Sequence, residues 1–139
     1  MDNKLKREII LKNYEHPKNK GLIVDDTYQC SNTSNESCID EINLMVKIED
    51  DKIVDIRFDG EACAVCTSST SIMINTLIGK TIEETKKIYQ NFESMIDAKK
   101  FNQDILEEAI VFCDISKQPS RKKCALLPWW GLKKIIDKQ

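Results

Sequence analysis

Residues 42–58, INLMVKIEDDKIVDIRF, decide the fold that this sequence predicts. The stretches INLMVKI and IVDIRF at its two ends are rich in β-branched and other apolar side chains, as strands are. The polar residues EDDK at 49–52 separate the two stretches and suit a turn. The sequence here therefore predicts an antiparallel hairpin, and Gly60 ends its second strand.

Two segments before the hairpin extend this prediction. Residues 22–30 are expected to supply a third antiparallel strand. Residues 4–13 place apolar side chains near one face of a 3.6-residue period, which predicts a short helix. His16-Pro17 then interrupts that helix, because proline disfavours the helical conformation of the residue before it.

The rest of the chain is predicted to be helical. Residues 64–80 contain poor helix formers, yet their small and apolar side chains recur at helical spacing. Thr81 and Glu84 form a capping-box pattern that opens a helix to about Met95. Two more helices are expected: from Asn102 or Asp104 to about Phe112, and near 126–137 with Pro128 in its first turns.

This order of elements predicts an α+β fold: a small three-stranded antiparallel sheet with helices packed on one face. With 139 residues the chain is long enough for one core, so a single domain over 1–139 is expected. The balance of 23 acidic against 21 basic residues lacks the basic excess of a nucleic-acid binder. The N-terminal stretch has no uninterrupted apolar segment, so neither a signal peptide nor a membrane span is expected.

The six cysteines point to the chemistry. In the reducing cytosol that these features predict, they are expected to be free thiols, metal ligands or catalytic groups rather than disulfides. In RKKCALLPWW, residues 121–130, one cysteine follows three cations, and neighbouring positive charge favours a thiolate. Two adjacent indoles on a helix cannot both face one core, so Trp129 or Trp130 is expected to be exposed as a partner contact.

Cys38, Asp40, Cys63 and Cys124 are the candidate metal ligands. Residues 38 and 40 point to the same side of an extended chain, and Cys63 lies near a predicted helix N-terminus that favours a thiolate. Three cysteines and one aspartate are a ligand set that tetrahedral zinc accepts. They could equally hold an iron–sulfur cluster, and the spacing by itself leaves both alternatives open.

The remaining candidates have structural interpretations. Cys66, one helical turn beyond Cys63, could be a substitute ligand, but a small buried helix residue is the favoured interpretation. Cys30 and Cys113 are interpreted as core residues. His16, the only histidine, is interpreted as a turn residue before Pro17 rather than a ligand.

Five ordered motifs resemble the NifU/IscU/SufU family of iron–sulfur cluster assembly proteins over nearly the whole chain. They are Tyr14-x-His16-Pro17-x-Asn19-x-Gly21, Cys38-x-Asp40, Gly60-x-Ala62-Cys63, the helix that ends in Gly79-Lys80, and Lys123-Cys124-Ala125-x-Leu127-Pro128-Trp129. The resemblance implies a SufE/NifU-like fold in which Cys38, Asp40, Cys63 and Cys124 form one exposed site. It also implies a partner, a SufS-like, pyridoxal-phosphate-dependent cysteine desulfurase that delivers persulfide sulfur, and downstream iron–sulfur assembly or acceptor proteins.

Within that family the sequence is more similar to the SufU-like branch. The scaffold branch has a histidine before the last cysteine, whereas residues 119–124 here match the SufU-like pattern Pro-x-Arg-x-Lys-Cys. The long step from Cys63 to Cys124 also fits that branch, whose members are usually described as zinc-containing sulfur acceptors. Ile39 departs from the family, which usually has glycine there.

The resemblance leads to a zinc-dependent sulfur acceptor as the first hypothesis, without deciding whether the protein is itself a sulfurtransferase. Cys38 is the first choice for the accepting thiol and Cys124 the second, with Arg121 as an anion-facing group. Cys124 is expected at the surface beside Cys38 and Cys63, in a docking face that includes Arg121. The alternatives are a scaffold on which an iron–sulfur cluster is assembled, and a non-catalytic, zinc-stabilised interaction domain.

Overall fold

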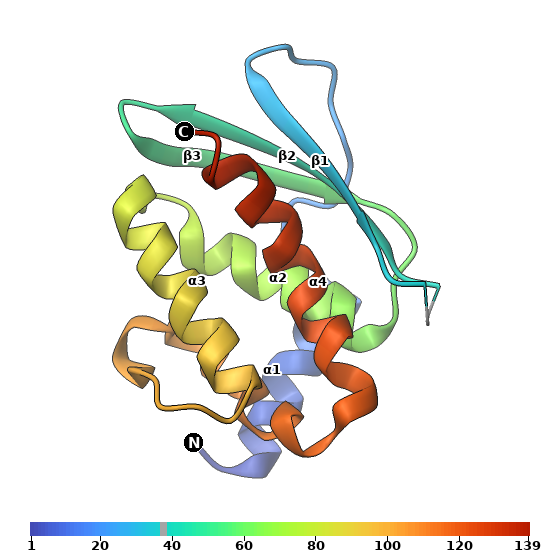
Figure 1. Cartoon of the computed structure of the whole chain (residues 1–139). Helices are drawn as coiled ribbons and strands as arrows, with labels where there is room; N and C mark the ends of the chain where they lie inside the picture. The colour runs from blue at the N-terminus through green and yellow to red at the C-terminus, as the bar shows by residue number, and fades with distance from the viewer. Residues whose placement is uncertain (37–38) are drawn as a thin grey trace.

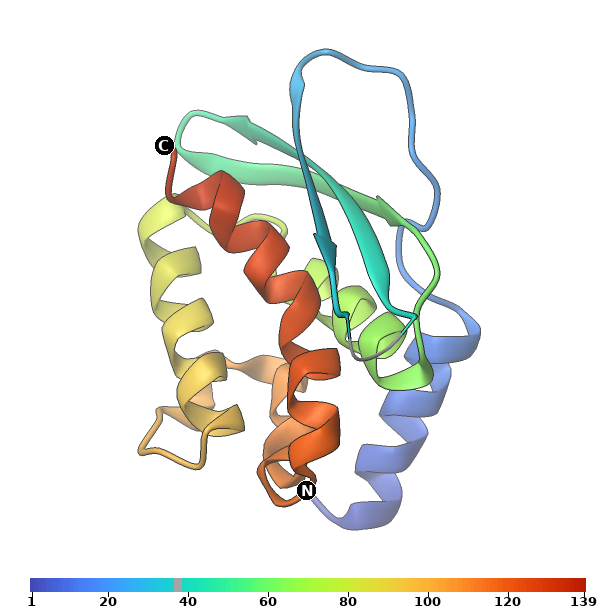
Figure 2. The ribbon, with the colours of Figure 1, turned by 45° about the vertical axis from the view of Figure 1, so that its right-hand side comes forward.

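The computed structural model describes residues 1–36 and 39–139 and has the predicted α+β architecture. A three-stranded antiparallel sheet has the order β1-β2-β3, and the helices pack on one of its faces (Figures 1 and 2). The elements along the chain are α1 (Asn3–Glu15), β1 (Tyr28–Ser34), β2 (Glu41–Glu49), β3 (Lys52–Asp59), α2 (Ala64–Leu77), α3 (Ile82–Ile96), the 3₁₀ helices η1 (Gln103–Ile105) and η2 (Glu107–Lys117), and α4 (Pro119–Ile136).

The β2–β3 hairpin forms as the sequence predicts and supplies the sheet side of the core. Leu44, Val46, Ile56 and Phe58 are buried, and the register pairs Leu44 with Phe58 and Val46 with Ile56. A register shift between Lys47 and Ile48 lies close to the turn. α2 and α4 pack on this face, and α1 and α3 lie beyond them.

Both edges of the hairpin have backbone hydrogen-bond partners. β1 pairs with β2 along its whole length, from Tyr28 opposite Lys47 to Ser34 opposite Glu41. On the other side, Gly21 N–H donates to Phe58 O at 2.7 Å and Ile53 N–H donates to Lys80 O at 2.9 Å. These bonds protect the backbone groups of β3, which would otherwise form a free sheet edge.

The third strand lies later in the sequence than predicted. β1 begins at Tyr28 rather than residue 22, and Leu22, Ile23 and Val24 are exposed in the preceding loop. The apolar composition of 22–24 misled the prediction. The observed strand is instead polar, and its Ser31 hydroxyl donates to Gly131 O on α4 at 2.9 Å. β1 is therefore selected by its contacts with α4 and β2 rather than by its own hydrophobicity.

Two helical predictions were also inaccurate. The segment after Asn102 consists of the two 3₁₀ helices, because Asn102 caps only a short turn through Asp104 N–H at 3.0 Å. The last helix begins at Pro119, not near 126, so Pro128 lies in its interior. Proline removes the N–H that would bond to Cys124 O, and this loss costs least in the first turn of a helix. The prediction therefore started the helix close to Pro128.

Candidate metal centre

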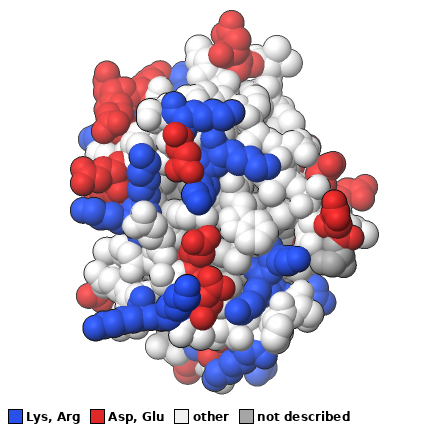
Figure 3. Space-filling view, viewed as in Figure 1, with Lys and Arg blue, Asp and Glu red and all other residues white. Residues whose placement is uncertain are grey.

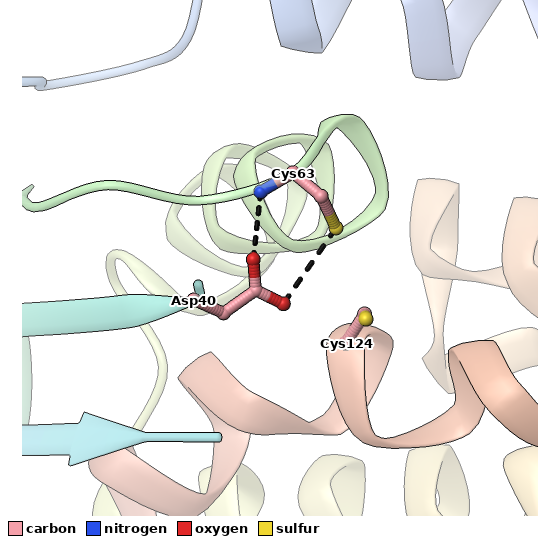
Figure 4. A group of neighbouring side chains, drawn as sticks. All are labelled: Asp40, Cys63 and Cys124. Atoms are coloured by element: carbon pink, nitrogen blue, oxygen red, sulfur yellow. Dashed lines mark hydrogen bonds between the residues drawn. The ribbon is translucent and has the colours of Figure 1, made fainter. Parts of the chain in front are cut away.

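Asp40 is the centre of the predicted site. It lies immediately before β2 and is 1% exposed, so its carboxylate needs hydrogen-bond partners. One oxygen accepts from Cys63 N–H at 2.7 Å, and the other lies 3.6 Å from Cys63 Sγ (Figure 4). The backbone and side chain of Cys63 thus hold one buried carboxylate between the start of β2 and the start of α2.

Cys63 is the N-cap of α2. Its sulfur accepts a long hydrogen bond from Cys66 N–H at 3.5 Å, in the position that a serine or aspartate oxygen usually occupies. The half-buried thiol is thus positioned by secondary structure as well as by Asp40.

Gly60 brings the two segments together, a role that the sequence analysis missed because it treated Gly60 only as the end of a strand. Its φ is +138°, and a Cβ atom there would lie 2.0 Å from Glu41 O. Glu41 N–H also donates to Glu61 O at 2.7 Å. The sequence signal was the spacing, since this glycine comes three residues before Cys63 and lies beside the residue that follows Asp40.

Cys124 lies beside Asp40 and Cys63 as predicted, but it is not at the surface. It is 1% exposed, on the inner side of α4, while Arg121 in the preceding turn is exposed. The prediction was wrong because the cations before Cys124 lie on other sides of the helix. Burial raises the pKa of the Cys124 thiol to about 12, with further contributions from the nearby Asp40 and Cys63 side chains.

The donor atoms of Asp40, Cys63 and Cys124 all lie within 4.8 Å of one another. Two sulfurs and a carboxylate oxygen from three elements are the ligand types of a tetrahedral zinc site, and metal binding would release the protons that free thiols retain. Among the described residues, His16 does not join this group and is the exposed C-cap of α1. The fourth predicted ligand, Cys38, lies outside the described residues.

The two tryptophans differ in burial, but neither has the exposure predicted for a partner contact, because Trp130 also packs against the core. Trp129 is buried and stacks on Phe92, with ring centroids 4.2 Å apart, while Trp130 is half-buried. The Trp129 indole N–H donates to the Ser69 hydroxyl at 3.2 Å, and that hydroxyl donates to Ala125 O at 2.6 Å. This chain of bonds fixes the part of α4 that carries Cys124 against α2.

The other thiols differ in their surroundings. Cys66 is fully buried, which confirms its interpretation as a small core residue. Cys113 is half-buried and packs against the core. Cys30 is exposed on β1, so its interpretation as a core residue was wrong. It lies on the sheet face opposite the helices, opposite Met45, where the pleat directs alternate residues.

These features define a class of protein: a small α+β domain in which one end of an antiparallel sheet meets two helix segments at a buried cysteine–aspartate site. The NifU-like N-terminal domain family matches residues 5–125, and the chain belongs to this family. The resemblance inferred from the five motifs is thereby confirmed.

Relatives in the family carry two kinds of name. The chain is 34% identical over 136 residues to the zinc-dependent sulfurtransferase SufU of Bacillus subtilis, covering 97% of this chain and 91% of that protein. It is 33% identical over 115 residues to the iron–sulfur cluster assembly scaffold protein IscU of Thermotoga maritima, covering 83% and 81%.

Solved structures agree with the fold. The crystal structure of FiSufU from Fervidobacterium islandicum AW-1, a candidate iron–sulfur cluster assembly scaffold protein for the SUF system, superposes with a TM-score of 0.83. It is 35% identical and covers 91% of this chain and 93% of its own. Within the described residues, no helix is long and apolar enough to span a membrane.

Proposed function

We propose that residues 1–139 act as one cytosolic domain, a zinc-dependent sulfur acceptor that takes persulfide sulfur from a cysteine desulfurase. The observation that carries the proposal is the convergence of Asp40, Cys63 and Cys124 from three elements at one point. The similarity to a protein named as a zinc-dependent sulfurtransferase supports the same function. Cys38 completes the proposed ligand set by its place in the Cys-x-Asp motif.

Zinc is the resident metal that we propose, because two thiolates and a carboxylate match its ligand preferences. When bound, it would keep the ligand thiolates deprotonated at neutral pH and order the segments that carry them. The hydrogen bond from Cys63 N–H to Asp40 orients the carboxylate before any metal is present.

The proposed transfer exchanges one sulfur–sulfur bond for another. A thiolate of this chain attacks the terminal sulfur of the desulfurase persulfide, so that a new S–S bond forms on this chain. The old S–S bond breaks, and its electron pair returns to the desulfurase cysteine as a thiolate. We propose Cys38 as the acceptor, because the burial of Cys124 favours a ligand role over direct attack on a partner's persulfide.

Docking of the desulfurase is proposed on the surface around Arg121 and Trp130. Arg121 is exposed in the first turns of α4, and Trp130 is half-buried two and a half turns further along the same helix. Arginine and tryptophan side chains are both enriched at protein interfaces. The partner would be a SufS-like, pyridoxal-phosphate-dependent enzyme, and the accepted sulfur would pass to downstream iron–sulfur assembly proteins.

A scaffold for iron–sulfur cluster assembly is the second candidate, because the relative from Thermotoga maritima carries that name. The same cysteines would then hold the cluster as cargo. The two functions differ in what the site must contain to work. Metal analysis after anaerobic purification, combined with desulfurase stimulation by the zinc-loaded protein, separates them.

The decisive test replaces each proposed cysteine ligand and, as a control, a cysteine that is not one. Single Cys→Ala changes at 38, 63 and 124 should each abolish stoichiometric zinc, measured by metal analysis. Cys66→Ser is the matched control, since Cys66 is buried one turn from Cys63 and should leave zinc bound. Full zinc retention by any of the three alanine variants removes that cysteine from the ligand set.

A second test addresses the docking surface. Arg121→Ala should weaken the binding of the desulfurase by about 1 kcal/mol, the scale of a partly exposed charged contact, and so reduce its stimulation. Zinc content should stay unchanged. Lys138→Ala removes an exposed charge at the other end of α4 and should have no effect. Unchanged stimulation by the Arg121 variant would exclude the docking role.

A further inference from the structure

A cavity lies between α1 and η2, away from the cysteine site. It encloses about 530 Å³, and its lining carries the cations Lys6, Arg7 and Lys117 with a single acid, Asp114. Lys6 and Arg7 lie at the start of α1, and Lys117 ends η2. Figure 3 shows basic side chains at this lower end of the molecule, where Figure 1 places the start of α1.

The charges in this cavity do not balance. Asp114 accepts from Lys6 Nζ at 2.9 Å and lies 3.7 Å from Lys117 Nζ, so one carboxylate is shared by two ammonium groups. Among the residues that the structure describes, Arg7 forms no ion pair with an acidic side chain. The lining therefore carries an excess of about two positive charges, one on Arg7 and one shared by the lysines.

The start of α4 adds to the positive potential, whereas the Asp2 carboxylate caps the start of α1. Beyond its cap Asp2, the first turn of α1 contains no acid, although acids are the residues that a helix N-terminus favours. Gln118 lines the cavity and begins α4 without a side-chain capping bond. The cations and the positive start of α4 repel one another, and an anion in the cavity would offset this repulsion.

The rest of the lining indicates the body of the ligand. Ile10, Val111 and Ile115 contribute apolar surface, and Asn3 adds a side-chain amide. The volume is larger than an inorganic phosphate or sulfate ion requires and falls within the range of small-molecule sites. We propose that this cavity binds a small organic dianion, a phosphate monoester or a dicarboxylate, with its charge on Arg7 and Lys117 and its carbon body on the isoleucines.

The cavity is separate from the proposed metal centre. Gln118 precedes Cys124 by six residues of α4, which corresponds to about 9 Å along the helix axis. Among the residues that the structure describes, none of the proposed metal ligands lines it. Binding can therefore be tested in the 139-residue chain without reference to zinc content or sulfur transfer, and the failure of either proposal would leave the other standing.

Calorimetric titration tests the site with defined probes. Phenyl phosphate, glutarate and inorganic phosphate are compared at constant ionic strength, since simple screening weakens all charge interactions alike. We expect saturable, one-to-one binding of phenyl phosphate or glutarate, at least several-fold tighter than that of inorganic phosphate. Whichever of the two organic probes binds more tightly identifies the head group as phosphate or dicarboxylate.

Charge-removing variants locate the binding. Arg7→Gln and Lys117→Gln should each weaken binding of the tighter probe about tenfold, the loss expected for one charge-assisted hydrogen bond. Lys87→Gln is the matched control, since Lys87 is an exposed lysine on α3. Arg7 and Lys117 are both exposed, and circular dichroism would confirm that the variants at these positions are folded.

Cys113 supplies an independent reporter, because this half-buried thiol immediately precedes Asp114 of the cavity lining. A bound dianion would reduce the positive potential around this neighbouring thiol, so alkylation of Cys113 by iodoacetamide should slow in wild type and not in Arg7→Gln. Mass spectrometry measures this rate at the single site. Absence of saturable binding by any probe, or equal binding by wild type and both cavity variants, would overturn the proposal.

Discussion

α2 and α3 follow each other in the chain and have nearly equal lengths, yet they begin in opposite ways. α3 has a complete capping box in which Thr81 Oγ1 accepts from Glu84 N–H at 3.1 Å and Glu84 accepts from Thr81 N–H at 3.0 Å. α2 begins at a thiol whose capping bond is long and whose position depends on Gly60 and Asp40. The start of α3 is specified locally, and the start of α2 by contacts with β2.

The two helices also differ in what surrounds them. α3 has an apolar stripe toward the core and a polar face toward solvent, whereas nearly all of α2 is buried. The buried hydroxyls of α2 either bond within the helix, as Ser68 does to Ala64 O, or reach other elements, as Ser69 does to Ala125 O. Most of α2 is therefore held by neighbouring elements, and these contacts position Cys63 at its start.

Replacement of Gly60 by alanine, which disturbs the start of α2, should have the largest effect on stability and metal binding. The new Cβ would meet Glu41 O at 2.0 Å and require an unfavourable φ, so we expect a loss of at least about 3 kcal/mol in unfolding free energy and the loss of metal binding. Gly79→Ala is the matched control, since its φ is +92° but nothing lies within 4 Å. Chemical denaturation and metal analysis of both variants measure the difference, and equal effects would contradict the role of close approach.

Ser69→Ala should have the next largest effect. It removes the acceptor of the buried Trp129 indole N–H, and an unpaired buried donor costs about 1–3 kcal/mol. Ser68→Ala removes an equally buried hydroxyl whose bonds stay within α2, so it should cost less than about 1 kcal/mol. Urea denaturation ranks the pair, and the reverse order would show that the link between α2 and α4 contributes little.

Thr81→Ala tests the self-contained start of α3. Loss of the capping oxygen should lower the unfolding free energy by about 1 kcal/mol, as for other N-cap replacements. Metal content should not change, because the proposed ligands lie on other elements. A variant that also lost metal would show that α3 and the site are coupled.

Cys63→Ser should have the smallest effect on stability and a complete effect on the site. Serine is a better N-cap than cysteine, so the unfolding free energy of the metal-free protein should change by only a few tenths of a kcal/mol. Zinc binding should be lost, since the soft thiolate ligand is replaced by a hydroxyl. Thermal unfolding with and without added zinc separates the two roles, and a large loss in the metal-free protein would show that the sulfur has a structural function.

Much of the fold was accessible from the sequence because its signals are local. The hairpin over 42–58, the α3 capping box and the burial of Cys66 each follow from a few neighbouring residues. The errors arose where local signals competed with distant contacts. Leu22, Ile23 and Val24 are apolar enough for a strand, but β1 begins beyond them, at Tyr28.

The sequence by itself determined which groups are available at the site. Asp40, Cys63 and Cys124 were identified from residue type, motif and resemblance, since the chemistry of a ligand depends on the side chain that the chain carries. It also determined that Cys63 would lie at a helix start. These are properties of short segments, in which spacing and composition act directly.

Only the tertiary structure decided how those groups are arranged. Cys124 is buried rather than exposed, Gly60 allows the loop to pass against Glu41, and Pro128 lies inside α4 rather than at its start. Each of these depends on atoms far apart in the chain that must share one small volume. The packing of α4 against α2 and the sheet orients the inner face of α4, and so places the Cys124 thiol beside Asp40.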